Sequence, residues 1–164
     1  MRALLQRVLR AEVSVDGRTT GKIGKGLLVL LGVMEGDTEA EAHYLADRIC
    51  GLRIFEDEKQ KMNKSVLDVD GEVLAVSQFT LAADVSHGRR PSFIAAAKPG
   101  CAQTLYQCFV DETSKLLNKP VPTGVFGADM KVALINDGPV TIWLDTEELR
   151  KKHDSENLDM DIYD

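Results

Sequence analysis

Hydrophobic residues in this chain occur mainly in short runs that are typical of strands, and two longer stretches have helical spacing. The run Leu27–Val33 is continuously apolar and bounded by glycines, which predicts a strand buried on both faces. From Ala42 to Leu52 apolar residues recur every three or four positions, which predicts a helix with one buried stripe. A second helix is predicted from about residue 101 to 117.

Turn residues divide the remainder of the chain into further strands. A hairpin is predicted in which Ser65–Val69 and Glu72–Leu81 flank the turn Asp70-Gly71. Residues 123–144 are also strand-rich. We therefore expect one compact α/β domain over residues 1–145, with mixed, largely antiparallel sheets or a barrel and two helices packed on one side. Residues 146–164 are polar and are predicted to form an acidic tail that is either a frayed helix or disordered.

The net charge of −6 lies almost entirely in that tail. Residues 145–164 contain eight acidic and three basic residues, which gives −5 and leaves −1 for residues 1–144. A near-neutral body argues against broad binding of nucleic-acid backbone, which requires clustered Lys and Arg, but permits a few contacts at the end of a strand. Arg89 and Arg90 form a small basic patch, and it is interpreted either as solvated loop or as a phosphate contact.

Three further features bear on the cellular compartment. No run of about 18 apolar residues is present, which argues against a membrane span. Charge interrupts the first seven residues, so a signal peptide is not expected. The three cysteines lack CxxC spacing and are expected to be reduced thiols. We therefore expect a cytoplasmic protein without a membrane partner.

Two short motifs stand out because each follows an apolar, strand-like run. They are Ser77-Gln78-Phe79-Thr80-Leu81, after residues 73–76, and Asn136-Asp137-Gly138-Pro139-Val140-Thr141, after residues 130–135. Each places small and polar groups at the end of a buried strand, where a rigid scaffold presents backbone groups to a ligand. The pattern indicates a site built from main chain.

Side-chain chemistry is weakly indicated by comparison. No His pair or carboxylate set has the spacing of a metal site, so neither a metal nor a cofactor is expected. Thr80 or Ser77 as a nucleophile would need a base within hydrogen-bond reach, and no motif supplies one, although His87 lies in a nearby loop. Periodicity alone is compatible with an ordinary strand. Alternatively, the N–H groups near Phe79 and Thr80 turn outward as an oxyanion pocket.

The pair Gly138-Pro139 also has two interpretations. Most such pairs form a plain turn. A cis bond is accessible because an X-Pro bond favours trans by only about 0.5–1 kcal/mol. With a cis bond, the neighbouring carbonyls would face one side as a rigid surface without side chains.

Taken together, the two motifs resemble the D-aminoacyl-tRNA deacylases, which remove D-amino acids from mischarged tRNA. Gln6-Arg7-Val8 and Arg90-Pro91-Ser92-Phe93 agree as well, and the resemblance spans residues 1 to about 145. It implies a homodimer that needs no cofactor. The implied partner is the tRNA 3′ end carrying a D-amino acid or glycine.

The resemblance also implies roles for individual residues. Main-chain N–H groups of Phe79 and Thr80 would face the ester carbonyl, and Ser77 and Gln78 would help form the pocket floor. The tRNA's own 2′-hydroxyl would assist the attacking water.

Gly138 and Pro139 would reach across the dimer and reject L-aminoacyl esters by collision, with Arg7 as a brace. Two alternatives stay open: an esterase that uses Thr80 as its nucleophile, and a non-catalytic module that binds the tRNA end.

Overall fold

The computed structural model describes residues 1–160, with the side chains placed up to residue 157. The strands are β1 (Arg2–Val15), β2 (Arg18–Ile23), β3 (Gly26–Gly32), β4 (Phe55–Glu56), β5 (Met62–Lys64), β6 (Glu72–Ser77) and β7 (Lys131–Asp145). The helices are α1 (Glu39–Gly51), the 3-10 helix η1 (Phe79–Ala82), α2 (Pro99–Leu117) and α3 (Thr146–Met160).

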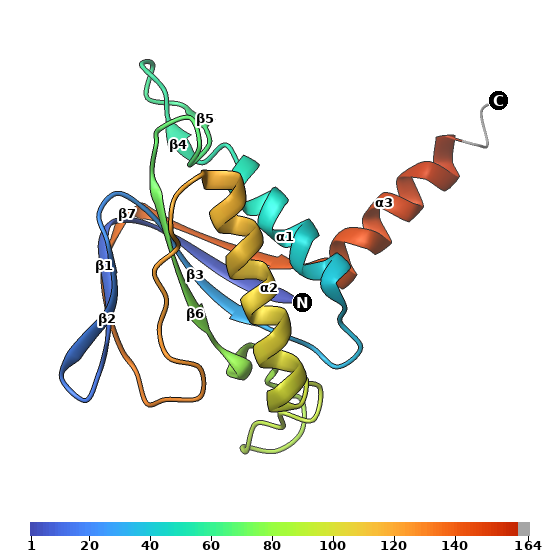
Figure 1. Ribbon diagram of the computed structural model, residues 1–164. Coiled ribbons are helices and arrows are strands. Elements are labelled where there is room, and N and C mark those ends of the chain that lie inside the picture. The colour runs from blue at the N-terminus through green and yellow to red at the C-terminus, as the bar shows by residue number, and fades with distance from the viewer. Residues whose placement is uncertain (161–164) are drawn as a thin grey trace.

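Strand β1 is the centre of the main sheet because it pairs with three others. The order is β2-β1-β3-β6, and β7 also pairs with β1. The β1 pairings with β2, β3 and β7 are antiparallel, whereas β3 and β6 run parallel. The sheet curls along the length of β1 and β7, as Figure 1 shows. The predicted mixed, largely antiparallel architecture is confirmed.

Helices α1 and α2 lie side by side on one face of the sheet (Figure 1). Thr38 caps α1 and forms a capping box with Glu41, which satisfies N–H groups that the first helical turn leaves unpaired. The main core fills the space between helices and sheet, where Leu5, Leu45 and Phe109 are fully buried. The prediction of two helices on one side is therefore confirmed.

The opposite face of the sheet has a smaller apolar cluster that is only partly covered. Its buried members are Val8, Ala11, Val13, Ile23, Leu28, Leu74 and Val76. Four more side chains that pack against them stay partly exposed: Leu30, Met130, Val132 and Leu134. Leu9 and Ile135, which lie on the same two strands as part of this set, are exposed as well.

The predicted hairpin over residues 65–81 is wrong. Strand β6 pairs with β3 and begins only at Glu72, and residues 66–70 form turns. Ser65 N–H donates to the Asp68 carboxylate at 2.8 Å, and Asp68 N–H donates to the Ser65 hydroxyl at 3.2 Å. These side chains offer the backbone local partners in place of a ladder, which is how Ser and Asp favour turns over strands.

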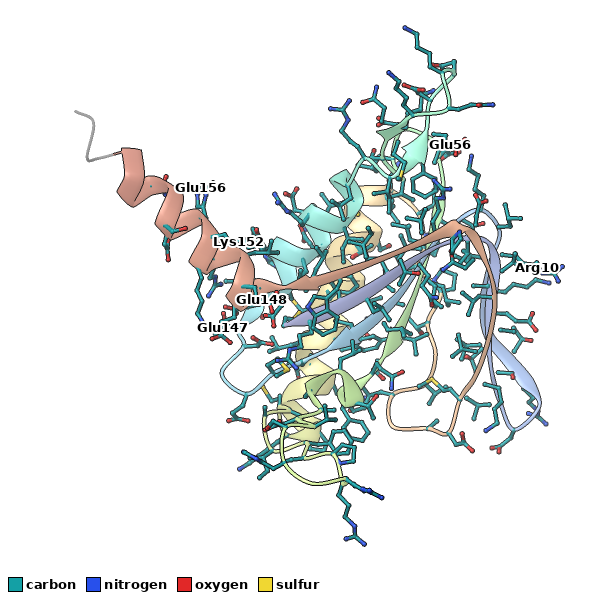
Figure 2. The ribbon with its side chains drawn as sticks, turned by 180° about the vertical axis from the view of Figure 1, so that it is seen from behind. Arg10, Glu56, Glu147, Glu148, Lys152 and Glu156 are labelled. Atoms are coloured by element: carbon teal, nitrogen blue, oxygen red, sulfur yellow. The ribbon has the colours of Figure 1, made fainter. Side chains whose placement is uncertain are left out.

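A third helix, α3, follows β7 directly. The Asp145 carboxylate accepts the Glu147 N–H at 2.9 Å at its start, and the helix extends away from the body (Figure 1). Glu147, Glu148, Lys152 and Glu156 project from it into solvent (Figure 2). Part of the predicted frayed or disordered tail is thus helical, and residues 161–164 lie outside the described residues. None of the helices described is long and apolar enough to span a membrane.

A candidate active site built from main chain

A cavity of about 660 Å³ opens at the end of β6. Its walls come from residues 76–79, from the segment 93–102 that leads into α2, and from residues 126–132. Most of these side chains are apolar. Ser77, Gln78 and Phe79 of the first motif all line the cavity, whereas Thr80 lies beside it and is not part of the lining.

The first motif changes conformation at the cavity. Strand β6 ends at Ser77, and Phe79 begins the 3-10 helix η1, so these residues do not continue as a strand with alternating faces. Gln78 N–H still donates to Leu31 O at 2.8 Å. The first N–H groups of a helix have no acceptor within it. Within residues 1–160, the N–H groups of Phe79 and Thr80 donate no hydrogen bond.

The side chains of the motif do not form a nucleophile with its base. The Thr80 hydroxyl accepts a hydrogen bond from the Gln78 side-chain amide, and in the described part of the chain no histidine or carboxylate is hydrogen-bonded to it. An amide cannot remove a proton from a hydroxyl at neutral pH. The geometry therefore favours main-chain chemistry here.

Phe79 forms an aromatic pair with Phe93 at the cavity. The ring centroids are 5.2 Å apart with an interplanar angle of 70°, an edge-to-face arrangement. Phe79 is 59% exposed although it is one of the larger apolar side chains. Sequence reasoning gave Phe93 no role in the site. The sequence feature that could have indicated this role is an aromatic residue three positions after the basic pair Arg89-Arg90.

The second motif forms a bulge in β7. Gln6 of β1 pairs with Thr141 and Val8 pairs with Asn136, so that Arg7 alone faces the four residues 137–140. The Gly138-Pro139 bond is cis, and both residues are exposed. Neither residue lines the cavity of its own chain. The structure thus does not bring the two motifs together within one protomer.

Arg7 of β1 holds the bulge of β7 through hydrogen bonds to main-chain oxygens. Its side chain is almost fully buried, and its Nε donates to Asp137 O at 3.1 Å while Nη1 donates to Ile54 O at 2.7 Å. A Cβ on Gly138 would lie 3.1 Å from Arg7 Nη2 and 2.9 Å from a methyl group of Val140. Gly138 also has φ of +130°, a region that L side chains rarely adopt. Glycine is therefore required at this position.

Asn136 closes the neck of the same bulge, a role that sequence reasoning missed. Its side-chain oxygen accepts the Val140 N–H at 2.8 Å, and its side-chain nitrogen donates to the Thr141 hydroxyl at 2.9 Å. Asn side chains commonly bond nearby backbone in turns. With Arg7 on one side and Asn136 across the neck, the exposed Gly-Pro tip is fixed from two directions.

The Tyr106 phenol lines the cavity and is held in its neutral form. Burial raises the pKa of Tyr106 to about 12, and its hydroxyl donates to Ala75 O at 2.9 Å. In residues 1–160 no cluster of three or more His, Cys, Asp or Glu side chains is arranged to hold a metal ion.

Comparison with known proteins identifies the family of this chain. Residues 4–145 match the family described as D-Tyr-tRNA(Tyr) deacylase. The chain is 61% identical to the D-aminoacyl-tRNA deacylase of Thermomicrobium roseum, over 92% of this chain and 97% of that protein. It is 57% identical to the D-aminoacyl-tRNA deacylase of Paracoccus denitrificans, over 90% of this chain and 99% of that protein.

Solved structures show the same fold. A c-Myc DNA unwinding element binding protein superposes with a TM-score of 0.85 at 42% identity, covering 89% of this chain and 99% of its own. A probable eukaryotic D-amino acid tRNA deacylase has a TM-score of 0.76 at 17% identity, covering 87% and 97%, which shows the fold alone. The protein is thus a hydrolase of the class that cleaves ester bonds. It belongs to the D-Tyr-tRNA(Tyr) deacylase family, as the motifs predicted.

Proposed function

We propose that the protein hydrolyses the ester bond of D-aminoacyl-tRNA and releases the free D-amino acid and tRNA. The observation that carries the proposal is the apolar cavity at the end of β6, lined by Phe79 with Thr80 beside it. In residues 1–160 the N–H groups of both residues are without an acceptor. Such N–H groups are suited to the oxygen of an ester carbonyl, on which negative charge develops as water attacks.

In this proposal the protein supplies position and hydrogen bonds, and the substrate supplies the proton chemistry. Among residues 1–160 no side chain at the cavity pairs a nucleophile with a base, and Tyr106 stays protonated because burial raises its pKa. We assign the positioning or activation of water to the 2′-hydroxyl of the terminal ribose, as the family resemblance implies. Thr80 then acts through its main chain and not through its hydroxyl.

Selection against L-aminoacyl esters is assigned to Gly138 and Pro139 of a second subunit. Discrimination by apolar contacts reaches only about 10- to 200-fold per methylene, whereas a collision rejects a wrong configuration whatever the side chain. The support is that this main-chain tip is exposed, is held by Arg7, and lies outside the cavity of its own chain. Glycine has no side chain to reject, so glycyl-tRNA is also proposed as a substrate.

A homodimer is proposed because selection across subunits requires a second copy of the chain. Leu30, Met130, Val132 and Leu134 form a partly covered apolar surface next to β1 and β7, and a second copy is the proposed cover. Light scattering at micromolar concentration tests this, and a monomer of about 18 kDa would exclude selection across subunits.

The deciding experiment compares hydrolysis of D-Tyr-tRNA, L-Tyr-tRNA and Gly-tRNA by the purified protein without added metal. Loss of the D and glycyl esters, with the L ester preserved, is the expected result. Equal loss of both tyrosyl esters would refute chiral rejection, and binding without hydrolysis would favour a tRNA-end binding module.

The Thr80→Ala variant separates the proposal from a nucleophile mechanism. Retention of most D-Tyr-tRNA hydrolysis is expected because the main-chain N–H is unchanged. Complete loss, with an acyl-enzyme trapped on the wild-type Thr80, would establish the esterase alternative.

A further inference from the structure

The loop between η1 and α2 is unusually basic for this chain. Residues 82–98 contain three cationic side chains, Arg89, Arg90 and Lys98, and one acidic side chain, Asp84, whereas the whole chain has a net charge of −6. All three cationic residues are exposed. Within residues 1–160 none of the three forms an ion pair, although ion pairs occur elsewhere on the surface. We name Arg89, Arg90 and Lys98 the basic rim.

The basic rim is held in place by main-chain hydrogen bonds. Asp84 and Ser92 exchange two backbone hydrogen bonds, at 2.8 and 2.9 Å, which close the loop that carries Arg89 and Arg90. The Asp84 carboxylate accepts hydrogen bonds from the N–H and hydroxyl of Ser86, so it is engaged inside the loop. Further along, Ala97 N–H donates to Val33 O at 3.0 Å. The rim is thus fixed to the end of the main sheet.

The same segment forms one wall of the cavity. Phe93 and Lys98 line it, and Phe93 contacts Phe79 edge to face. Two more apolar side chains of the segment are strongly exposed, Val85 at 71% and Ile94 at 91%. Cationic side chains that track a backbone, together with aromatic and apolar faces for bases, are the combination by which proteins bind single-stranded nucleic acid.

We propose that the basic rim binds phosphates of the single-stranded 3′ end of tRNA, just upstream of the terminal nucleotide whose ester enters the cavity. This inference rests on the proposed function. The rim is local, so it attracts the strand near the cavity, while the acidic C-terminal tail repels RNA. Arg suits this role because its planar guanidinium engages two phosphate oxygens at once.

The test compares two substrates that share the ester but differ in phosphates. One is D-Tyr-tRNA, and the other is 3′-O-D-tyrosyl-adenosine, which has no phosphate. The R89Q/R90Q double variant should raise KM for D-Tyr-tRNA by roughly 2- to 30-fold with kcat little changed, since each exposed charge contact contributes modestly. The variant should hydrolyse the adenosine ester within about twofold of the wild-type rate.

Two controls make the result specific. K59Q/K61Q removes the same charge from the loop between β4 and β5, which lies at the opposite end of the molecule (Figure 1), and should leave KM unchanged. R89K/R90K keeps the charge but not the two-oxygen contact, and should raise KM less than R89Q/R90Q does. The salt dependence of log KM should fall in slope by roughly 1.4 in R89Q/R90Q, because each single-strand phosphate contact accounts for about 0.7.

The outcomes separate this inference from the proposed function. If the wild type hydrolyses neither D ester, the proposed function fails. If it hydrolyses both and R89Q/R90Q leaves the KM for D-Tyr-tRNA unchanged, the basic rim does not bind phosphate. Equal loss on both substrates would show that the arginines only support the local structure, which also overturns the inference.

Discussion

Replacing Arg7 by methionine tests how the exposed Gly-Pro tip is held. Arg7 lies on β1 and donates to two main-chain oxygens, Ile54 O and Asp137 O, from an almost fully buried side chain. Methionine keeps much of the aliphatic volume but has no donor. The variant therefore removes both hydrogen bonds and leaves the packing of the strand largely in place.

The expected cost follows from the two hydrogen bonds. A hydrogen bond from a charged donor contributes about 1.5–3 kcal/mol, so losing two would cost about 3–6 kcal/mol. The low end is expected, because Asp137 is partly exposed and its groups can turn to water, whereas Ile54 is buried and its carbonyl is left without this donor. We expect the free energy of unfolding to fall by about 3 kcal/mol, or roughly 6–12 °C in Tm.

Urea unfolding of the wild type and the Arg7→Met variant measures this change, and paired D- and L-Tyr-tRNA hydrolysis measures selection. Arg10→Met is the matched control, since Arg10 lies on the same strand but projects into solvent (Figure 2) and should cost less than about 0.5 kcal/mol. Hydrolysis of the L ester should rise in Arg7→Met alone. A stability loss below about 1 kcal/mol would refute the assignment of two hydrogen bonds from the buried Arg7 guanidinium, and unchanged selection would refute its role in holding the Gly-Pro tip.

Three further predictions concern other parts of the molecule. Burial raises the pKa of Glu41, but hydrogen bonds from the hydroxyl and N–H of Thr38 outweigh this and lower the pKa to about 2. About 3 kcal/mol of stability is therefore present above about pH 4.5 and should be lost as the pH falls toward 2. Urea unfolding at pH 5 and pH 2.5 should show this loss in the wild type and little of it in Glu41→Gln. Tyr106→Phe removes one hydrogen bond to Ala75 O and should lower the unfolding free energy by about 1 kcal/mol, measured in urea at pH 7. Asn136→Ala removes both hydrogen bonds across the neck of the bulge and should raise the rate of L-ester hydrolysis. An unchanged ratio of D- to L-ester hydrolysis would contradict the positioning role of Asn136.

Much of the fold could be predicted from apolar spacing. The strand at Leu27–Val33 and the helix over Ala42–Leu52 were both predicted, and β3 and α1 lie there. The hairpin at 65–81 failed because Ser65 and Asp68 bond their own backbone, an effect that alternation of apolar residues does not reveal. The helical start of the tail was also not distinguished from disorder, since its residues are polar on all sides.

The candidate site was predicted in part. Both motifs were predicted as main-chain features at strand ends. This holds for the first, since β6 ends at Ser77, and is wrong for the second, which lies inside β7 as a bulge. The functional roles of these residues stay predictions. The 3-10 turn after Ser77 and the bulge opposite Arg7 could not be predicted, because both depend on pairing between strands far apart in sequence.

In a site made of backbone groups, the residues whose identity matters most are those that hold the backbone in place. Two arginines of β1 do so here: Arg2 donates to Leu81 O in η1 at 2.7 Å, and Arg7 donates to Asp137 O beside the Gly-Pro tip. Carbonyl oxygens are present at every residue, so sequence gives no sign of which ones these arginines reach. Side chains at the proposed catalytic position, such as the Thr80 hydroxyl, should therefore tolerate substitution better than arginines that touch no substrate.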